Sequence, residues 1–282
     1  MMISGYLFAF TIIKHDLKYI VTSKIRSLLV PIITWGTLKN IYSIVTTRSF
    51  SPIECLTEYL TSLWFLWAVL ICSAIVLFVN KAFKDASWIY LTIIMASLFI
   101  PDGNNASLYV FVFPYFVAGY YWSKLQIETK KSFDVRVYYL MIVAALYVVL
   151  FLFYGKNSFV YTSGTWLLNK DRSISTQIGI DLYRWAIGFV GSVMTILLLE
   201  IGGKYFHVKI KKILESLGKS TLGIYIIDVP FSEYILKRLC AGFHLNYALI
   251  AGETVFAILV AYILIRIIKH FPVLDKLMLG GK

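Results

Sequence analysis

Residues 1–31 read MMISGYLFAFTIIKHDLKYIVTSKIRSLLVP. The first thirteen are apolar, and at a rise of 1.5 Å each they cover about 20 Å, less than the roughly 30 Å hydrocarbon core of a bilayer. A basic segment from Lys14 to Arg26 follows, and a full-length apolar run begins at Leu28. Because membrane spans rarely start without a polar flank, we expect the chain to begin partway along a transmembrane helix. A secretory signal peptide is disfavoured, since no basic segment precedes the apolar stretch and no small-residue cleavage site follows it.

The composition is that of a polytopic membrane protein. Of the 282 residues, 59% are hydrophobic and only 15% are charged. A soluble domain of this size could not bury so many apolar side chains. The sequence shows no repeat, low-complexity tract or soluble domain. We therefore predict one all-α domain over residues 1–282, a transmembrane bundle of about nine helices. The apolar runs that would form the spans are 1–13, 28–46, 62–80, 88–100, 107–123, 138–154, 178–200, 217–237 and 247–268.

Lysine and arginine separate by side of the membrane. Segments 14–27, 81–87, 124–137 and 201–216 together with the tail from Lys269 hold 17 of the 27, whereas 47–61, 101–106, 155–177 and 237–246 hold 6. By the positive-inside rule the first set and the C-terminus are cytoplasmic. The net charge of +12 is thus a topology signal rather than a sign of nucleic-acid binding. Nine spans leave the two ends on opposite sides, which again predicts a truncated N-terminus.

The three cysteines have no metal-binding or redox spacing, and we predict no metal site. Cys72 lies in an apolar run and is expected to be a packing residue. Cys55 and Cys240 both fall in predicted external loops, where a disulfide is chemically allowed. Two free thiols are the alternative.

The connecting segments differ in character. Residues 14–27 are predicted to be an amphipathic connector on the inner face, with Pro31 in the first turn of the span that follows. The external stretch 47–61 leads into an aromatic belt at Trp64. The longest loop, 155–177, is polar and external, and it is the best candidate for contact with something outside the cell.

Several short motifs occur in the order found in one membrane-protein family. They are Ser4-Gly5-Tyr6-Leu7 with the basic connector and Lys24-Ile25-Arg26-Ser27-Leu28-Leu29-Val30-Pro31, then Trp64-Phe65-Leu66, Phe113-Pro114-Tyr115-Phe116 with Gly119, Leu217-Gly218-Lys219-Ser220-Thr221-Leu222-Gly223-Ile224-Tyr225, and Leu277-Met278-Leu279-Gly280. Over essentially the whole chain this series resembles the acyltransferase family 3 membrane proteins. The resemblance implies about ten helices and transfer of an acyl group, usually acetyl from acetyl-CoA, to sugars of glycans, lipopolysaccharide or small glycosides.

Two departures from the family pattern bear on catalysis. The resemblance implies an essential Arg and His on a first helix, and that helix is absent from this sequence. The family also often has a His a few residues after the Ile-Tyr of its penultimate helix, where this chain has Asp228. The catalytic residues therefore stay unknown, with Asp228 as a candidate.

Ionisable residues within predicted spans are costly and usually face a partner or a wet cavity. Asp181 and Arg184 are spaced i, i+3 and are expected to pair on one helix face. Glu233 and Glu253 fall at comparable depth near the outer side, while Lys39 and Asp228 could meet near the midplane. Each pair is either an ion pair that fixes helix packing or part of a polar cavity between an inner donor site and an outer acceptor site.

Arg26 and Lys24 sit at the predicted inner interface. They either set topology and attract anionic lipid, or they bind the phosphates of an acyl-CoA. The family resemblance favours the second interpretation for Arg26. None of the four histidines lies in the middle of a predicted span.

Together these features predict a multi-pass O-acyltransferase of the cell (plasma or inner) membrane that acylates a cell-surface glycan or glycolipid. No bound cofactor is expected, and acyl-CoA (acetyl-CoA) would be the co-substrate. The truncation leaves the activity of this chain in doubt. A transporter or flippase that uses the internal charges as a substrate path is the alternative from another class. A non-catalytic family remnant is the third.

Overall fold

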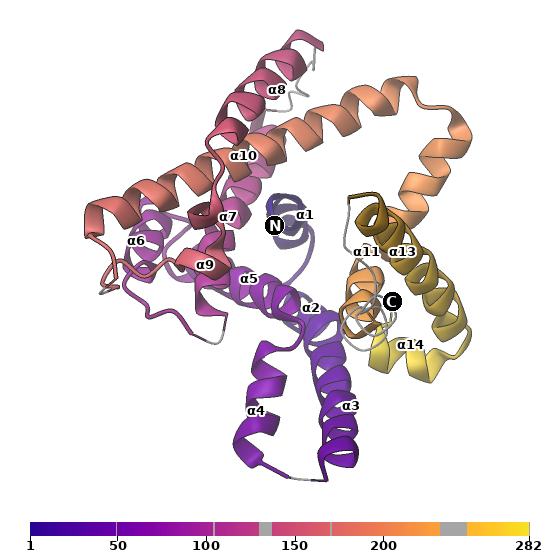
Figure 1. Cartoon of the computed structure of the whole chain (residues 1–282). Helices are drawn as coiled ribbons and strands as arrows, with labels where there is room; N and C mark the ends of the chain where they lie inside the picture. Colours follow the sequence, from indigo (N-terminus) through magenta and orange to yellow (C-terminus); the bar gives the residue numbers. More distant parts are fainter. Residues whose placement is uncertain (49, 104, 130–136, 170, 232–246, 282) are drawn as a thin grey trace. The chain divides into compact units, whose positions relative to one another are not determined.

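The computed structural model describes residues 1–48, 50–103, 105–129, 137–169, 171–231 and 247–281. Within these residues the regular structure is helical and no strand occurs (Figure 1). In these residues each predicted apolar run lies largely on a helix, so the all-α prediction is confirmed. The helices are α1 (Met2–Lys14), α2 (Leu17–Lys24), α3 (Val30–Thr47), α4 (Pro52–Thr61), α5 (Trp64–Ala82), α6 (Ser87–Ser97), α7 (Ala106–Thr129), α8 (Val137–Leu152), α9 (Val160–Ser163), α10 (Ile174–Tyr205), α11 (Val208–Phe231), α13 (Tyr247–His270) and α14 (Pro272–Met278).

Four helical stretches in the described residues are long and apolar enough to cross a membrane. They are Leu17–Thr46, Trp64–Ala82, Ile174–Tyr205 and Leu249–His270. Three shorter apolar helices accompany them, namely α1, α6 and α8. Together these helices make the chain a multi-pass membrane protein.

The helices form two compact units, which are described separately. Unit 1 comprises Met1–Ile20 and Ala68–Phe206, and unit 2 comprises Val21–Trp67 and His207–Lys282. The boundary passes through α2 and α5, so each unit contains part of both helices.

In unit 1, α1 lies directly against α7. A Cβ atom added at Gly5 would overlap the carbonyl oxygen of Phe116, and one added at Gly119 would overlap that of Met2. Small residues let two helix backbones approach in this way, and in a membrane such close van der Waals packing drives association. The two glycines therefore set the separation of α1 and α7.

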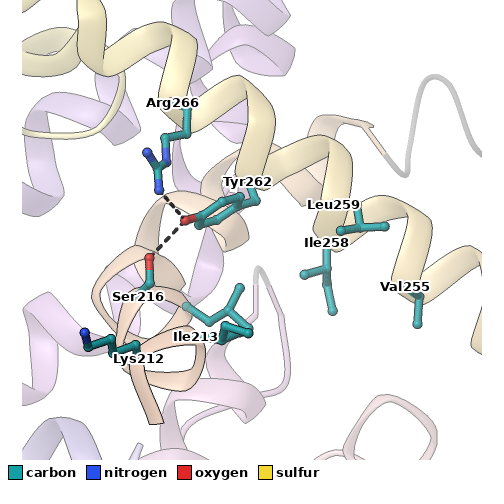
Figure 2. A pocket seen from close by; sticks show the side chains of 9 residues that line it. Lys212, Ile213, Ser216, Val255, Ile258, Leu259, Tyr262 and Arg266 are labelled. Atoms are coloured by element: carbon teal, nitrogen blue, oxygen red, sulfur yellow. Dashed lines mark hydrogen bonds between the residues drawn. The ribbon is translucent and has the colours of Figure 1, made fainter. Parts of the chain in front are cut away.

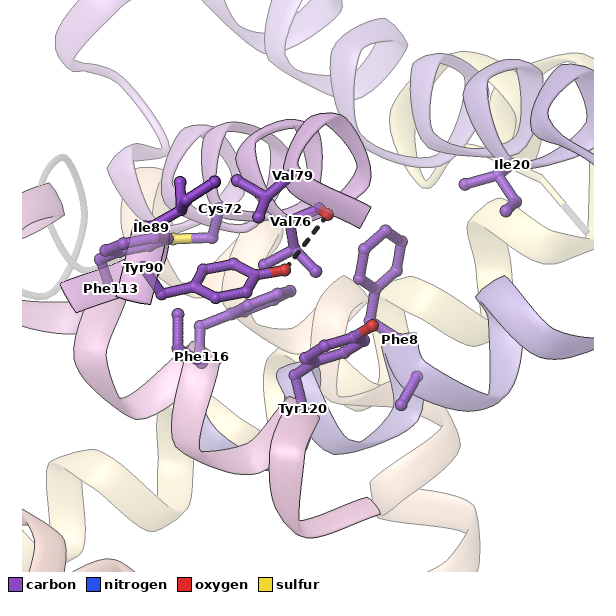
Figure 3. Packing of buried hydrophobic residues seen from close by; sticks show 12 residues of the cluster. Phe8, Ile20, Cys72, Val76, Val79, Ile89, Tyr90, Phe113, Phe116 and Tyr120 are labelled. Carbon is purple, nitrogen blue, oxygen red and sulfur yellow. Dashed lines mark hydrogen bonds between the residues drawn. The ribbon is translucent and has the colours of Figure 1, made fainter. Parts of the chain in front are cut away.

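A cluster of large side chains fills the interior of unit 1 around this helix pair. Phe8 of α1, Tyr90 of α6 and Phe116 of α7 are almost completely buried, and Cys72 packs among them as predicted (Figure 3). The Tyr90 hydroxyl points toward α5, where it lies 3.5 Å from the Val76 carbonyl oxygen. Four helices thus share one aromatic core.

The segment between α5 and α6 is held by a buried carboxylate. Asp85 accepts hydrogen bonds from the hydroxyls of Tyr90 at 2.7 Å and Tyr120 at 3.0 Å, and from Lys124 Nζ at 2.7 Å. The Asp85 backbone is in the left-handed region with φ of 61°. This conformation is strained for a residue with a side chain, and the three bonds stabilise it.

In unit 2 the structure differs from the sequence prediction in two connectors. The predicted loop 47–61 contains helix α4, which begins with Ser51 accepting a hydrogen bond from the Glu54 amide at 3.4 Å and with Pro52 in the first turn. Ser-Pro-x-Glu is a helix start signal, and the low hydropathy of the segment obscured it.

The second difference concerns the basic connector, which is part of one helical run with the following span. Between α2 and α3 the backbone winds as a π-helix over Ile25–Leu29, with the Val30 amide donating to the Ile25 carbonyl. Pro31 has no N–H to bond the Ser27 carbonyl four residues earlier, which accounts for wider winding directly before it. Pro31 lies in the first turn of α3, as predicted, and α3 continues the helical run that begins at Leu17.

Candidate functional site

Arg184 of α10 is a buried cation of unit 1 with several hydrogen-bond and ion-pair partners. Its Nη1 lies 3.3 Å from Asp181 Oδ1, which confirms the pairing expected from the i, i+3 spacing. Nη1 also donates to the Gly164 carbonyl at 2.6 Å, and Nη2 donates to Ser163 Oγ and, at 3.5 Å, to the Asn157 carbonyl. The guanidinium therefore ties α10 to the segment that precedes it.

The same cluster contains a buried amide. Gln177 Nε2 lies 3.3 Å from each carboxylate oxygen of Asp181 and donates to the Gly164 carbonyl at 3.2 Å. Asp181 and Arg184 are 1% and 2% exposed, so their charges are compensated by one another and by these polar neighbours. This arrangement is consistent with an ion pair that stabilises the fold. The two hydrogen bonds to the Gly164 carbonyl also fix the backbone at Gly164.

The other predicted intramembrane charges belong to the sequence ranges of unit 2. Lys39 Nζ lies 2.8 Å from Glu58 Oε1 of α4, a partner that the sequence did not predict because 47–61 was expected to be a loop. The proposed meeting of Lys39 with Asp228, which is half-buried on α11, stays a prediction. Glu253 on α13 has a buried carboxylate oxygen, Oε1, with no hydrogen-bond partner among the described residues. Glu233 lies outside the described residues.

Of the two cysteines in the predicted Cys55–Cys240 pair, the structure describes only Cys55. Cys55 on α4 is a free thiol in this structure. Its predicted partner, Cys240, lies outside the described residues. The part of the chain that the structure describes contains no group of three or more His, Cys, Asp or Glu side chains that could hold a metal ion.

The two predicted donor-binding residues lie on adjoining parts of the long helical run. Lys24 is half-buried at the end of α2, and Arg26 is exposed within the π-helical turn. Gly280 packs against the backbone of Arg26 and Ser27, while Trp35 Nε1 donates to the Met278 carbonyl at 3.2 Å. The C-terminal segment thus braces the part of the chain that carries Arg26.

A groove of about 490 Å³ runs between α11 and α13 in unit 2. Its walls are largely apolar, and Lys212 and Arg266 supply cations (Figure 2). The Tyr262 hydroxyl lies 2.9 Å from Ser216 Oγ and accepts a hydrogen bond from Arg266 Nη2 at 2.8 Å, so it bridges the two helices. None of these groove residues was a predicted site residue, since each one alone is ordinary for a membrane-interface helix.

The motifs quoted from the sequence contact one another in pairs within each unit. In unit 1, Gly5 of the first motif packs on Phe116 of the Phe113-Pro114-Tyr115-Phe116 motif. In unit 2, the Tyr225 hydroxyl accepts a hydrogen bond from the Phe65 amide at 3.2 Å, with the two rings 5.4 Å apart. The tail motif packs on Ser27 through Gly280, as described above. The motifs therefore have clear packing roles.

Sequence reasoning missed Asp85, Glu58 and the polar environment of Gly164. Asp85 lies in segment 81–87, where only the lysines and arginines were considered. A signal was present, because tyrosines at 90, 120 and 121 and Lys124 offer several donors to one acid, but their proximity depends on tertiary packing.

Comparison with known proteins identifies a family. A family model described as an acyltransferase domain, that of acyltransferase family 3, matches residues 1–266. No curated protein and no solved structure matches the chain.

Proposed function

Because the chain belongs to acyltransferase family 3, we propose that it transfers an acyl group, acetyl in the first instance, from acyl-CoA to a hydroxyl of a cell-surface glycan or its lipid-linked precursor. The observation that carries this proposal is the family match over residues 1–266 of a chain with several membrane-spanning helices. The family supports acyl transfer in a membrane, and the donor and acceptor are the proposed part.

The reaction exchanges a thioester for an ester. The acceptor oxygen attacks the thioester carbonyl, the carbon–sulfur bond breaks, and the CoA sulfur leaves. A base takes the hydroxyl proton and returns it to the departing thiolate. Within this chain Asp228, half-buried on α11, is the candidate for that role, because it is an acid near the middle of a predicted span.

Arg26 is the proposed contact to the donor, with Lys24 beside it. An exposed guanidinium can form bidentate, charge-assisted bonds to the phosphates of CoA. Its location in a π-helical turn supports the assignment, because such turns occur frequently at functional sites. The bracing of this turn by Gly280 would reduce the movement of Arg26 on binding.

We further propose that the protein lies in the plasma or inner membrane with a cytoplasmic C-terminus. Segments that the basic residues assign to one side contact each other: Asp85 bonds Lys124, and Gly280 packs on Ser27. On the opposite side, the Thr165 amide donates to Asp102 at 3.0 Å. These contacts agree with the assignment, since loops on one side of a membrane can touch and loops on opposite sides cannot.

Donor binding is testable with purified protein in detergent. Acetyl-CoA should raise the unfolding temperature of the unmodified chain, Arg26→Ala should remove most of this protection, and Arg26→Lys should restore it in part. Lys18→Ala is the matched control, because Lys18 is an exposed cation of the same helical run. Absence of protection, or equal protection in Arg26→Ala, would contradict the donor assignment.

Transfer itself is tested with labelled acetyl-CoA and glycoside acceptors. Asp228→Asn should abolish transfer above a membrane blank while leaving protection by acetyl-CoA intact. Undiminished transfer in Asp228→Asn would show that another group takes the proton.

A further inference from the structure

A pocket of about 360 Å³ opens in unit 1 between the turn after α6 and the segment that contains α9. It lies beside the Asp181–Arg184 cluster, because Ser163 and Gly164 belong to both. The polar side chains among its lining residues are Asp102, Asn105, Ser107, Thr162, Ser163 and Asn169. Its volume lies at the lower end of the range of about 300–1,000 Å³ that is usual for small-molecule sites.

Hydrogen bonds hold both walls of this pocket in place. On one side, Asp102 Oδ1 accepts from Ser107 Oγ at 2.8 Å and from the Thr165 amide at 3.0 Å. On the other side, Ser163 bonds the buried guanidinium of Arg184, and its carbonyl accepts from Arg172 at 3.2 Å. The Leu167 amide donates to the Leu98 carbonyl at 2.9 Å and joins the two segments. The site is therefore largely formed before a ligand arrives.

The lining combines a carboxylate, hydroxyls and amides with one exposed ring. Tyr161 is 77% exposed, although it is large and mostly apolar. Hydroxyls and amides can both donate and accept, as the hydroxyls of a sugar do, and an exposed aromatic face packs on the C–H groups of a pyranose ring. Asp102 accepts hydrogen bonds from hydroxyls but repels anions.

We propose that this pocket binds one neutral pyranose residue, with Tyr161 against its ring and Asp102, Thr162 and Asn169 around its hydroxyls. The proposal rests on the glycan acylation proposed above, for which this pocket would be an acceptor-binding subsite on the outer side. Both segments that form it are among those with few basic residues, which the charge distribution places outside.

Binding can be measured without any acyl transfer. Saturation-transfer difference NMR on the purified full chain would use methyl glycosides of glucose, galactose, mannose, rhamnose and N-acetylglucosamine as probes. We expect transfer to ring protons of at least one glycoside, and about tenfold weaker affinity in Tyr161→Ala. Thr162→Val, which removes a hydroxyl at nearly constant shape, should lower the affinity for the same glycoside.

The matched control is Tyr205→Ala, because Tyr205 is 78% exposed on α10 and does not line the pocket. It should bind the glycoside as the unmodified chain does. No saturation transfer to any glycoside, or equal affinity in Tyr161→Ala and Tyr205→Ala, would overturn the inference. Protection by acetyl-CoA, measured on the same samples, separates the two proposals, since it depends on donor binding and is unaffected by loss of sugar binding.

Discussion

Asp85 gathers three donors from two helices onto one buried carboxylate, so a single side chain connects the end of α5 with α6 and α7. Replacing it with alanine leaves two tyrosine hydroxyls and Lys124 without this acceptor, and it keeps a side chain at a left-handed backbone position. We expect Asp85→Ala to lower the free energy of unfolding by about 3 kcal/mol. Unfolding in mixed detergent micelles measures it.

Asparagine and a surface acid provide the comparison for this prediction. Asp85→Asn should lose less stability, because asparagine tolerates the left-handed region and retains one acceptor oxygen. Asp171→Ala removes an exposed acid in the turn before α10 and should have little effect. Equal stability of Asp85→Ala and Asp171→Ala would show that the buried carboxylate does not stabilise the fold.

The Asp181–Arg184 pair predicts strong coupling. Arg184→Leu leaves Asp181 buried without its counter-charge and removes the bonds to Ser163 and Gly164, so it should be the more damaging single change. Each single change should cost about 3–5 kcal/mol, and the double change to leucine should cost less than Arg184→Leu alone. A double-mutant cycle of unfolding free energies tests this, and a double variant no more stable than Arg184→Leu would argue against a structural pair.

Single-residue inference from sequence succeeded where partners are local. The Asp181–Arg184 contact follows from helical periodicity, since i and i+3 share a face. Lys39 and Glu58 belong to different helices, and the second helix was not recognised. Asp85 shows the same limit, because its partners are up to 39 positions away and only the packing of α7 brings them close.

At the scale of whole elements, the α1–α7 contact depends on two glycines. Gly5→Ala or Gly119→Ala places a methyl group where the other helix has a backbone carbonyl, which a side-chain rotation cannot relieve. We expect either change to separate the helices and to cost several kcal/mol, on the scale of core overpacking or more. The unfolding midpoint in detergent is the measurement.

Gly179→Ala is the control for these changes. Gly179 lies within α10, and a Cβ there would meet nothing within 4 Å. Alanine favours helix over glycine by about 1 kcal/mol, so this variant should be as stable as the unmodified chain or more so. If Gly5→Ala and Gly119→Ala behaved like Gly179→Ala, the close approach of the two helices would not be required.

Element positions were predicted well for apolar runs and less well between them. Hydropathy locates a span because a run of about twenty apolar residues matches the thickness of the hydrocarbon core and rarely occurs elsewhere. It does not recognise α4, an amphiphilic ten-residue helix, or the continuation of α2 into α3 through a π-helical turn. Both depend on hydrogen-bonding geometry at a proline, which hydropathy does not measure.

For the whole molecule, the testable property is orientation in the membrane. In a background without Cys55, Cys72 and Cys240, a membrane-impermeant maleimide on intact cells should label Lys156→Cys. Lys276→Cys should react only after permeabilisation, because the basic tail is assigned to the cytoplasm. Both native positions are exposed, so reactivity reports the side of the membrane. The reverse labelling pattern would overturn the orientation.

The contact of Gly280 with Arg26 and Ser27 also constrains how the protein is made. The ribosome synthesises the π-helical turn that contains Arg26 roughly 250 residues before Gly280. At bacterial and eukaryotic elongation rates this delay is on the order of 10 to 50 s. During that interval we expect the span after this turn to enter the bilayer while its brace does not yet exist. The π-helical turn that carries Arg26 therefore gains its contact with Gly280 only when translation is nearly finished. A nascent chain halted before residue 280 would have an inserted span whose preceding turn lacks this contact.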